Sequence, residues 1–181
     1  MEFKIEHTRV YGLDKSFKAS GNPMRTIIDD GEVTEKDKTR AFRLGVQLDI
    51  TAPLYFWKQA QRYHWFDFVS SQSTMHCLLK FDIEKQCVKD TNKEIIDIMN
   101  RLVSEYNNMA EDDINKKSKW RELVASLPCG FCLGATMTTN YQQLKTMYLQ
   151  RRYHKLDEWH VFCAWCESLP DFVELTGVKN L

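Results

Sequence analysis

The sequence predicts an α+β fold built as a single domain over residues 1–181. Strand-like patterns of apolar and polar residues occur in two stretches, 2–10 and 131–139. Apolar residues also recur at helical spacing over 92–108, directly after polar capping residues. A chain of 181 residues is long enough to bury a sizeable core as one domain.

The amino-terminal part is predicted to contain two strands separated by a loop. EFKIEHTRV (2–10) forms the first strand. Residues 20–38 are polar and rich in turn formers, so we expect a loop that leads into a short helix at about 34–43. VQLDI (46–50) is expected to form the second strand.

An aromatic segment, LYFWKQAQRYHWFDF (54–68), is expected on the helix that follows. Thr51 is a suitable N-cap for this helix. Ala52 and Pro53 fall in its first turn, where the missing N–H of proline costs nothing. The segment mixes rings with amides and cations, which a purely apolar core does not need.

The middle of the chain carries a turn, an extended segment and a long helix. SSQST (70–74) is a serine-rich turn, and CLLKFDI (77–83) is expected to be extended. Thr91 to Glu94 has the sequence of a capping box, which predicts the helix over 92–108.

The last third is predicted to pass from helix to strand to helix. A short helix over about 118–126 ends at Leu127-Pro128. The strand at 131–139 then leads to Asn140, which can cap the next helix.

The charge balance and hydropathy limit the class of partner. The chain has 25 basic and 25 acidic residues, which gives no strong nucleic-acid signal. No apolar run approaches the roughly 20 residues that span a bilayer, so we expect no membrane partner. With no apolar signal segment after the amino terminus, we expect a cytoplasmic protein.

Two CxxC pairs, Cys129–Cys132 and Cys163–Cys166, raise the question of a zinc site. Their separation exceeds the usual zinc-ribbon spacing. The second pair also shares a helical face with the apolar residues Trp159, Phe162 and Leu169. The pattern therefore favours thiols packed in the core over zinc, and over a thioredoxin-like redox pair.

Two arginines fall on helical faces that are otherwise aromatic or apolar. In the helix expected after Thr51, Gln59 and Arg62 lie between aromatic residues at helical spacing. Arg151 similarly shares a face with apolar residues of the last predicted helix. A guanidinium on an inward face needs a carboxylate or a phosphate. The arginines therefore form a site for an anionic, ring-containing ligand, or they pair with internal acidic residues, or their stems reach outward to solvent.

The spacing of several motifs resembles the flavin-dependent thymidylate synthases of the ThyX type. Leu127-Pro128 is followed by Asn140 twelve positions after the proline, and by Arg151 eleven positions further. The first half adds the pattern Ala-Pro, Lys-Gln and Arg-Tyr-His, at 52–53, 58–59 and 62–64. The chain looks most like short, divergent members found in phage and prophage genomes.

The resemblance implies an α+β subunit with a mixed or antiparallel sheet packed with helices. It implies a homo-oligomer that binds FAD and dUMP at subunit junctions and methylates the pyrimidine with methylenetetrahydrofolate. The nucleotide-binding candidates on this chain are Gln59, Arg62 and Arg151. The cofactor-binding candidates are His64, Ser73, Asn140 and His154.

The chain departs from the family at its signature, R-H-R-x-x-S-x-N-E-x-S-x-R-Y. This signature falls on residues 62–75, and Arg62 alone keeps its residue type. The lost cations would hold phosphates of flavin and nucleotide, and charge-assisted bonds of this kind contribute about 1.5–3 kcal/mol each. The sequence therefore makes FAD binding doubtful.

Three functions are compatible with these residues. The first is a nucleotide-binding protein on a ThyX-like fold, without ordinary flavin-dependent dUMP methylation. The second is an FAD-dependent thymidylate synthase or a related pyrimidine-nucleotide methyl or hydroxymethyl transferase. The third is a phage anti-defence protein or a host-protein-binding protein that reuses the fold, because Trp, Tyr and Arg are enriched at interfaces.

Overall fold

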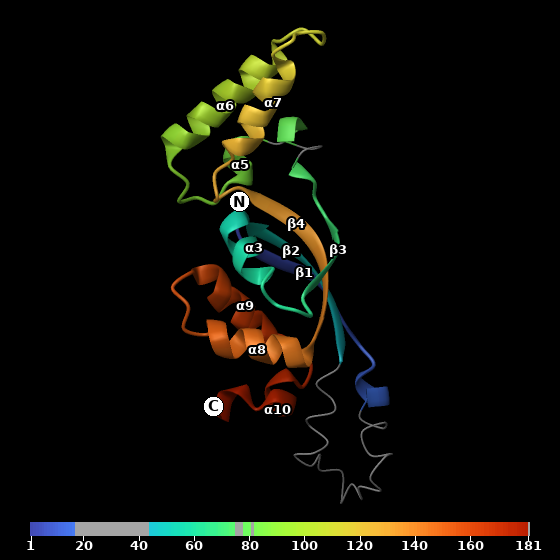
Figure 1. The fold of residues 1–181 in the computed structure, drawn as a ribbon. Helices are drawn as coiled ribbons and strands as arrows, with labels where there is room; N and C mark the ends of the chain where they lie inside the picture. Colours follow the sequence, from blue (N-terminus) through green and yellow to red (C-terminus); the bar gives the residue numbers. More distant parts are fainter. Residues whose placement is uncertain (17–43, 75–77, 81, 181) are drawn as a thin grey trace, which may run out of the picture. The chain divides into compact units, whose positions relative to one another are not determined.

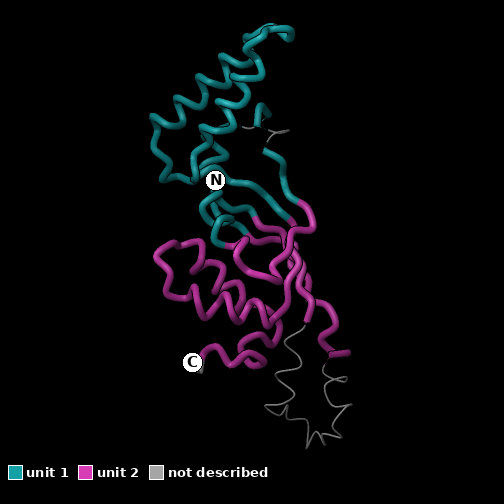
Figure 2. Tube along the Cα trace, viewed as in Figure 1, with its two compact units in different colours: residues 1–4, 51–59, 71–135 teal, residues 5–50, 60–70, 136–181 magenta. Residues whose placement is uncertain are grey.

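The computed structural model describes residues 1–16, 44–74, 78–80 and 82–180. The loop predicted at 20–38 and the helix predicted at 34–43 lie outside the described residues. The described chain divides into two compact units (Figure 2). The prediction of a single domain over 1–181 stays a prediction.

Four strands form an antiparallel sheet, and the remaining elements are helices, so the α+β class is confirmed (Figure 1). In their order of pairing the strands are β1 (Lys4–Tyr11), β2 (Gly45–Pro53), β4 (Cys132–Asn140) and β3 (Asp67–Ser71). The three strands predicted at 2–10, 46–50 and 131–139 correspond to β1, β2 and β4.

The prediction of a helix that begins directly after Thr51 is wrong in both its first residue and its length. β2 continues through Pro53, and helix α3 spans only Leu54–Ala60. Burial alternates along β2 up to the buried Ala52, so tertiary packing holds this segment in the strand. Proline has no backbone N–H to donate to a neighbouring strand. At the last position of a strand, no further sheet hydrogen bond depends on that donor.

Unit 1 comprises residues 1–4, 51–59 and 71–135, and its helices pack around one apolar cluster. These helices are η2 (Leu78–Lys80), α5 (Ile83–Gln86), α6 (Lys93–Asn107) and α7 (Lys116–Ala125). The extended segment predicted at 77–83 is therefore wrong where the structure describes it. The carboxylate of Asp82 caps α5 by accepting from the backbone N–H of Lys85, which favours a helical turn there.

Helices α6 and α7 form a hairpin, as Figure 1 shows. The helix predicted at 92–108 is confirmed, although its N-cap is Asn92 and not Thr91. The helix predicted at 118–126 is also confirmed. Between the two helices, the rings of Tyr106 and Trp120 have centroids 5.6 Å apart.

Unit 2 comprises residues 5–50, 60–70 and 136–181, and it contains the carboxy-terminal helices. These are α8 (Tyr141–Arg151), α9 (Asp157–Ser168), α10 (Phe172–Thr176) and η3 (Val178–Asn180). Helices α8 and α9 lie side by side in Figure 1. The indole N–H of Trp165 on α9 donates to the hydroxyl of Thr8 on β1 over 2.9 Å, which ties α9 to the sheet.

Within the described residues, no helix combines the length and the apolar character that crossing a bilayer requires.

Candidate functional site

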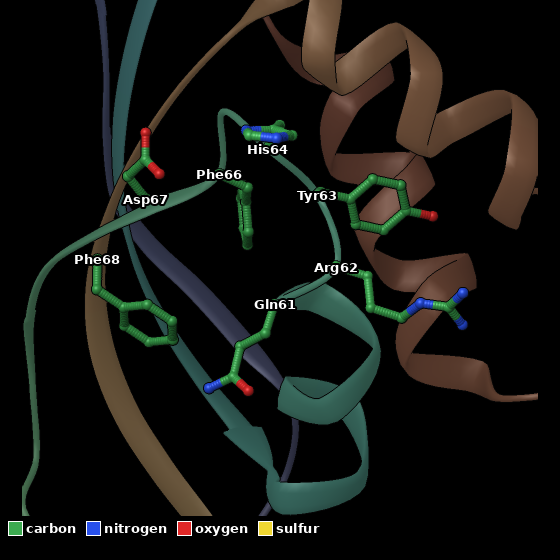
Figure 3. A pocket seen from close by; sticks show the side chains of 7 residues that line it. All are labelled: Gln61, Arg62, Tyr63, His64, Phe66, Asp67 and Phe68. Carbon is green, nitrogen blue, oxygen red and sulfur yellow. The ribbon is translucent and has the colours of Figure 1, made fainter.

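The turn between α3 and β3 forms a pocket of about 460 Å³ in unit 2 (Figure 3). It is lined by Gln61, Arg62, Tyr63, His64, Phe66, Asp67 and Phe68. Figure 3 shows Arg62 and Tyr63 extending toward the helices of unit 2, while Asp67 and Phe68 belong to the strand. The pocket therefore contains cationic, aromatic and acidic side chains within eight consecutive residues.

This segment leaves the helix earlier than the sequence predicts. Helix α3 ends at Ala60, and residues 61–66 form turns. The predicted helical face that joins Gln59, Arg62 and Phe66 is therefore wrong. The N–H of Tyr63 donates to the carbonyl of Ala60 over 3.1 Å, which closes the first turn after the helix.

Two aromatic side chains attach the turn to the helices of unit 2. Phe66 is 3% exposed and meets Phe162 of α9 edge to face, with centroids 6.1 Å apart. The hydroxyl of Tyr63 donates to the side-chain oxygen of Gln150 over 3.0 Å. The ring of Tyr63 also lies edge to face with Trp159, at 6.3 Å.

Arg151 lies at the end of α8, half-buried against this aromatic group. Its guanidinium carbon is 4.7 Å from the ring centroid of Trp159 and 5.5 Å from that of Tyr63. Its Nε donates to the Tyr63 hydroxyl over 2.8 Å. Such cation–π contacts contribute about 0.5–2 kcal/mol each. The structure thus brings Arg151 to the pocket-forming turn through Tyr63.

Arg62 and His64 lie on either side of Tyr63 and are exposed. Among the residues that the structure describes, Arg62 forms no ion pair. The one carboxylate of the pocket lining belongs to Asp67, which is also exposed. The lining therefore offers a guanidinium, an imidazole and one opposing carboxylate to a ligand.

Two of the cofactor-binding candidates have structural roles in unit 2. The side-chain oxygen of Asn140 accepts from the backbone N–H of Gln143 over 2.9 Å, so the predicted helix cap is confirmed. The Nδ1 atom of His154 accepts from the backbone N–H of Leu156 over 3.1 Å. Burial, with the charges of Arg151 and His160, lowers the pKa of His154, which favours a neutral imidazole at neutral pH.

Gln59 and Ser73 belong to unit 1, where Gln59 lies on α3 and Ser73 follows β3. Both are partly exposed. Their roles in nucleotide and cofactor binding stay predictions.

The cysteine pairs differ in burial. Cys129 is exposed and Cys132 is buried in unit 1, whereas Cys163 and Cys166 are both buried in α9. The second pair is part of the core, as predicted. Burial raises the pKa of Cys163 to about 11 and also raises that of Cys166, so both thiols are protonated at neutral pH. Within the described residues, no three His, Cys, Asp or Glu side chains are grouped to hold a metal ion.

The sequence did not single out Tyr63, although this residue attaches the pocket turn to α8. Its signal was present in the aromatic density of residues 54–68, but a helix through the whole segment would have placed Tyr63 on a different side from Arg62. Gln61, Asp67 and Phe68 were also missed, because they line a pocket that only the turn creates.

Comparison with solved structures identifies the fold. The flavin-dependent thymidylate synthase ThyX from Helicobacter pylori, complexed with FAD and dUMP, matches with a TM-score of 0.65 and 15% identity over 97% of each chain. The fold is ThyX-like. The UMP/dUMP methylase PolB from Streptomyces cacaoi, bound with 5-Br UMP, matches with a TM-score of 0.57 and 11% identity, over 97% of this chain and 94% of that chain. No protein-family model and no curated protein sequence matches this chain.

Proposed function

We propose that this protein binds a pyrimidine nucleoside monophosphate in the pocket of residues 61–68. The observation that carries the proposal is the pocket itself, whose lining combines Arg62 and His64 with the aromatic residues Phe66 and Phe68. Two proteins with the same fold support it, since their structures contain dUMP and 5-Br UMP.

The chemistry of the lining suits the two parts of such a ligand. The guanidinium of Arg62 can form bidentate, charge-assisted hydrogen bonds with a phosphate, and a ring N–H of His64 can add a donor. The ring of Phe68, which is 42% exposed, provides apolar surface for a base. A volume of about 460 Å³ lies within the range usual for small-ligand sites.

The described pocket does not fit FAD. A dinucleotide brings two phosphates, whereas the lining holds one arginine and the carboxylate of Asp67, which repels a second phosphate. The side-chain oxygen of Asn140 already caps α8, and the Nδ1 atom of His154 already accepts a backbone N–H. We therefore propose nucleotide binding without ordinary flavin-dependent dUMP methylation, and no reaction step is assigned to flavin.

Titration of dUMP and UMP into the purified protein tests this function. We expect Arg62→Ala to weaken binding of either monophosphate at least tenfold, because one charge-assisted contact is lost, and to leave binding of uridine unchanged. Arg121→Ala, at an exposed position of α7 in unit 1, is the matched control and should bind like the wild type. Unchanged binding in Arg62→Ala would rule out this site.

A second candidate function is attachment to a host protein, the expected behaviour of a phage anti-defence protein. The side chain of Trp65 is 55% exposed, and those of Phe68 and Val69 are exposed beside it. Full biological activity in an Arg62→Ala, Arg151→Ala double variant would favour this candidate over nucleotide binding. Mass spectrometry of small molecules released on denaturation would favour the flavin-dependent transferase instead if it detected FAD.

A further inference from the structure

The pocket turn has few backbone contacts to hold its shape. For residues 61–66 in the described structure, the one backbone hydrogen bond outside regular elements joins Tyr63 to Ala60. Side chains must therefore supply the rest of the order, because a residue whose backbone is not fixed by contacts retains conformational entropy. Tyr63 and Phe66 are the inward side chains, and the residues between them are exposed.

Tyr63 has the densest set of contacts in this turn. Its hydroxyl accepts from Nε of Arg151 at 2.8 Å and donates to the side-chain oxygen of Gln150 at 3.0 Å. Its ring lies beside Trp159 and under the Arg151 guanidinium. The hydroxyl thus donates one hydrogen bond and accepts one, so its orientation is fixed in two directions.

We infer that Tyr63 is the positioning residue of the phosphate subsite, and that Arg151 acts on the ligand through it. Arg62 and His64 are the chain neighbours of Tyr63, so anchoring the Tyr63 side chain fixes the backbone from which both donors extend. Figure 3 shows the side chains of Arg62 and Tyr63 extending in the same general direction. The role of Tyr63 in the phosphate subsite rests on the proposed function. The role of Tyr63 in anchoring the turn does not depend on that function.

Arg151 can either contact the phosphate directly or hold Tyr63 in place, and a lysine at position 151 distinguishes these two roles. If Arg151 contacted the phosphate itself, a lysine at 151 would keep the charge and most of the affinity. If it acts through Tyr63, lysine fails, because it lacks the Nε donor and the planar guanidinium that stacks on Trp159. Tyr63→Phe should then have the same effect as Arg151→Lys, since each removes the same hydrogen bond.

Binding of UMP and uridine to these variants tests the phosphate part. We expect Tyr63→Phe and Arg151→Lys each to weaken UMP binding about tenfold and to leave uridine binding within twofold. The double variant should lose no more than either single one, because both act on one contact. Tyr148→Phe, which removes a tyrosine hydroxyl from α8 that bonds to Glu167 and not to Tyr63, is the control and should bind like the wild type. Equal losses for UMP and uridine, or additive losses, would overturn the inference.

Limited trypsin digestion tests the anchoring without any ligand. Trypsin cleaves after arginine, and the Arg62–Tyr63 bond lies in the exposed turn. Mass spectrometry should show faster cleavage at this bond in Tyr63→Phe than in the wild type or in Tyr148→Phe. An equal rate would contradict the anchoring. If the wild type binds no UMP, the proposed function and the phosphate part fail together, and the digestion still decides the anchoring.

Discussion

Neighbouring residues of the aromatic segment have opposite environments. Phe66 is buried against Phe162, while Trp65 beside it is exposed. The hydroxyl of Tyr63 bonds to Gln150 of α8 and its ring contacts Trp159 of α9, while Arg62 and His64 line the pocket. Tyr63 and Phe66 thus hold the turn in place, while the side chains of Arg62 and His64 are exposed.

Asn140 has a structural role that can be tested, although the resemblance to ThyX synthases made it a cofactor-binding candidate. Its side-chain oxygen caps α8, so Asn140→Ala should lower the free energy of unfolding by about 1 kcal/mol. Asn140→Asp should retain most of the stability, because the carboxylate also caps and complements the helix dipole. Urea denaturation measures both. An alanine variant as stable as the wild type would contradict the capping role.

Asp49 predicts a specific dependence of stability on pH. Its carboxylate accepts from the Thr136 hydroxyl at 2.6 Å and contacts His7 at 2.9 Å, and these contacts lower its pKa in the folded state. The unfolded state therefore binds the proton more readily, so this contribution to stability is present above pH 4 and is lost as the pH falls below it.

Thr136→Val removes the hydrogen bond that lowers this pKa most. The loss of unfolding free energy between pH 5 and pH 3 should therefore be smaller in the variant than in the wild type. Urea denaturation at several pH values in this range gives the comparison. Identical pH dependences would show that the Thr136 contact does not control the titration of Asp49.

At the scale of elements, helix α6 was predictable and helix α3 was not. α6 has a polar N-cap at Asn92 and a regular apolar face, and both signals are local. The two ends of α3 are set by contacts with other elements. The residues before Leu54 belong to β2, and the residues Tyr63 and Phe66 after the helix contact α8 and α9. Local propensity does not contain these tertiary contacts, so the sequence overextended the helix.

The two faces of α6 should respond differently to truncation. Leu102 is 4% exposed in the apolar cluster of unit 1, whereas Ile98 on the same helix is 47% exposed. Leu102→Ala should cost about 2–5 kcal/mol of unfolding free energy, and Ile98→Ala less than about 1 kcal/mol. Chemical denaturation of the two variants measures the difference. Similar losses would contradict the orientation of α6 in the structure.

For the whole molecule, the spacing from Pro128 to Asn140 to Arg151 indicated the fold because these residues mark element boundaries. Pro128 lies between α7 and β4, Asn140 caps α8, and Arg151 ends it. A ThyX-like fold therefore survives at 15% identity to a solved synthase. The pocket was less predictable, since it depends on a turn whose shape is fixed by helices far along the chain.

The homo-oligomer implied by the family stays a prediction, and sedimentation of the purified protein checks it. We expect an assembly larger than the 21.4 kDa chain. A monomer at micromolar concentration would contradict this expectation, while leaving the pocket of residues 61–68 open to direct test.

Nuclear magnetic resonance of the isotope-labelled protein tests the central proposal most directly, because it locates a ligand as well as detecting it. Addition of UMP or dUMP should shift the backbone resonances of residues 61–68 and saturate, with smaller changes for Tyr63→Phe. Shifts confined to other parts of the chain, or no shifts at millimolar nucleotide, would contradict nucleotide binding in this pocket.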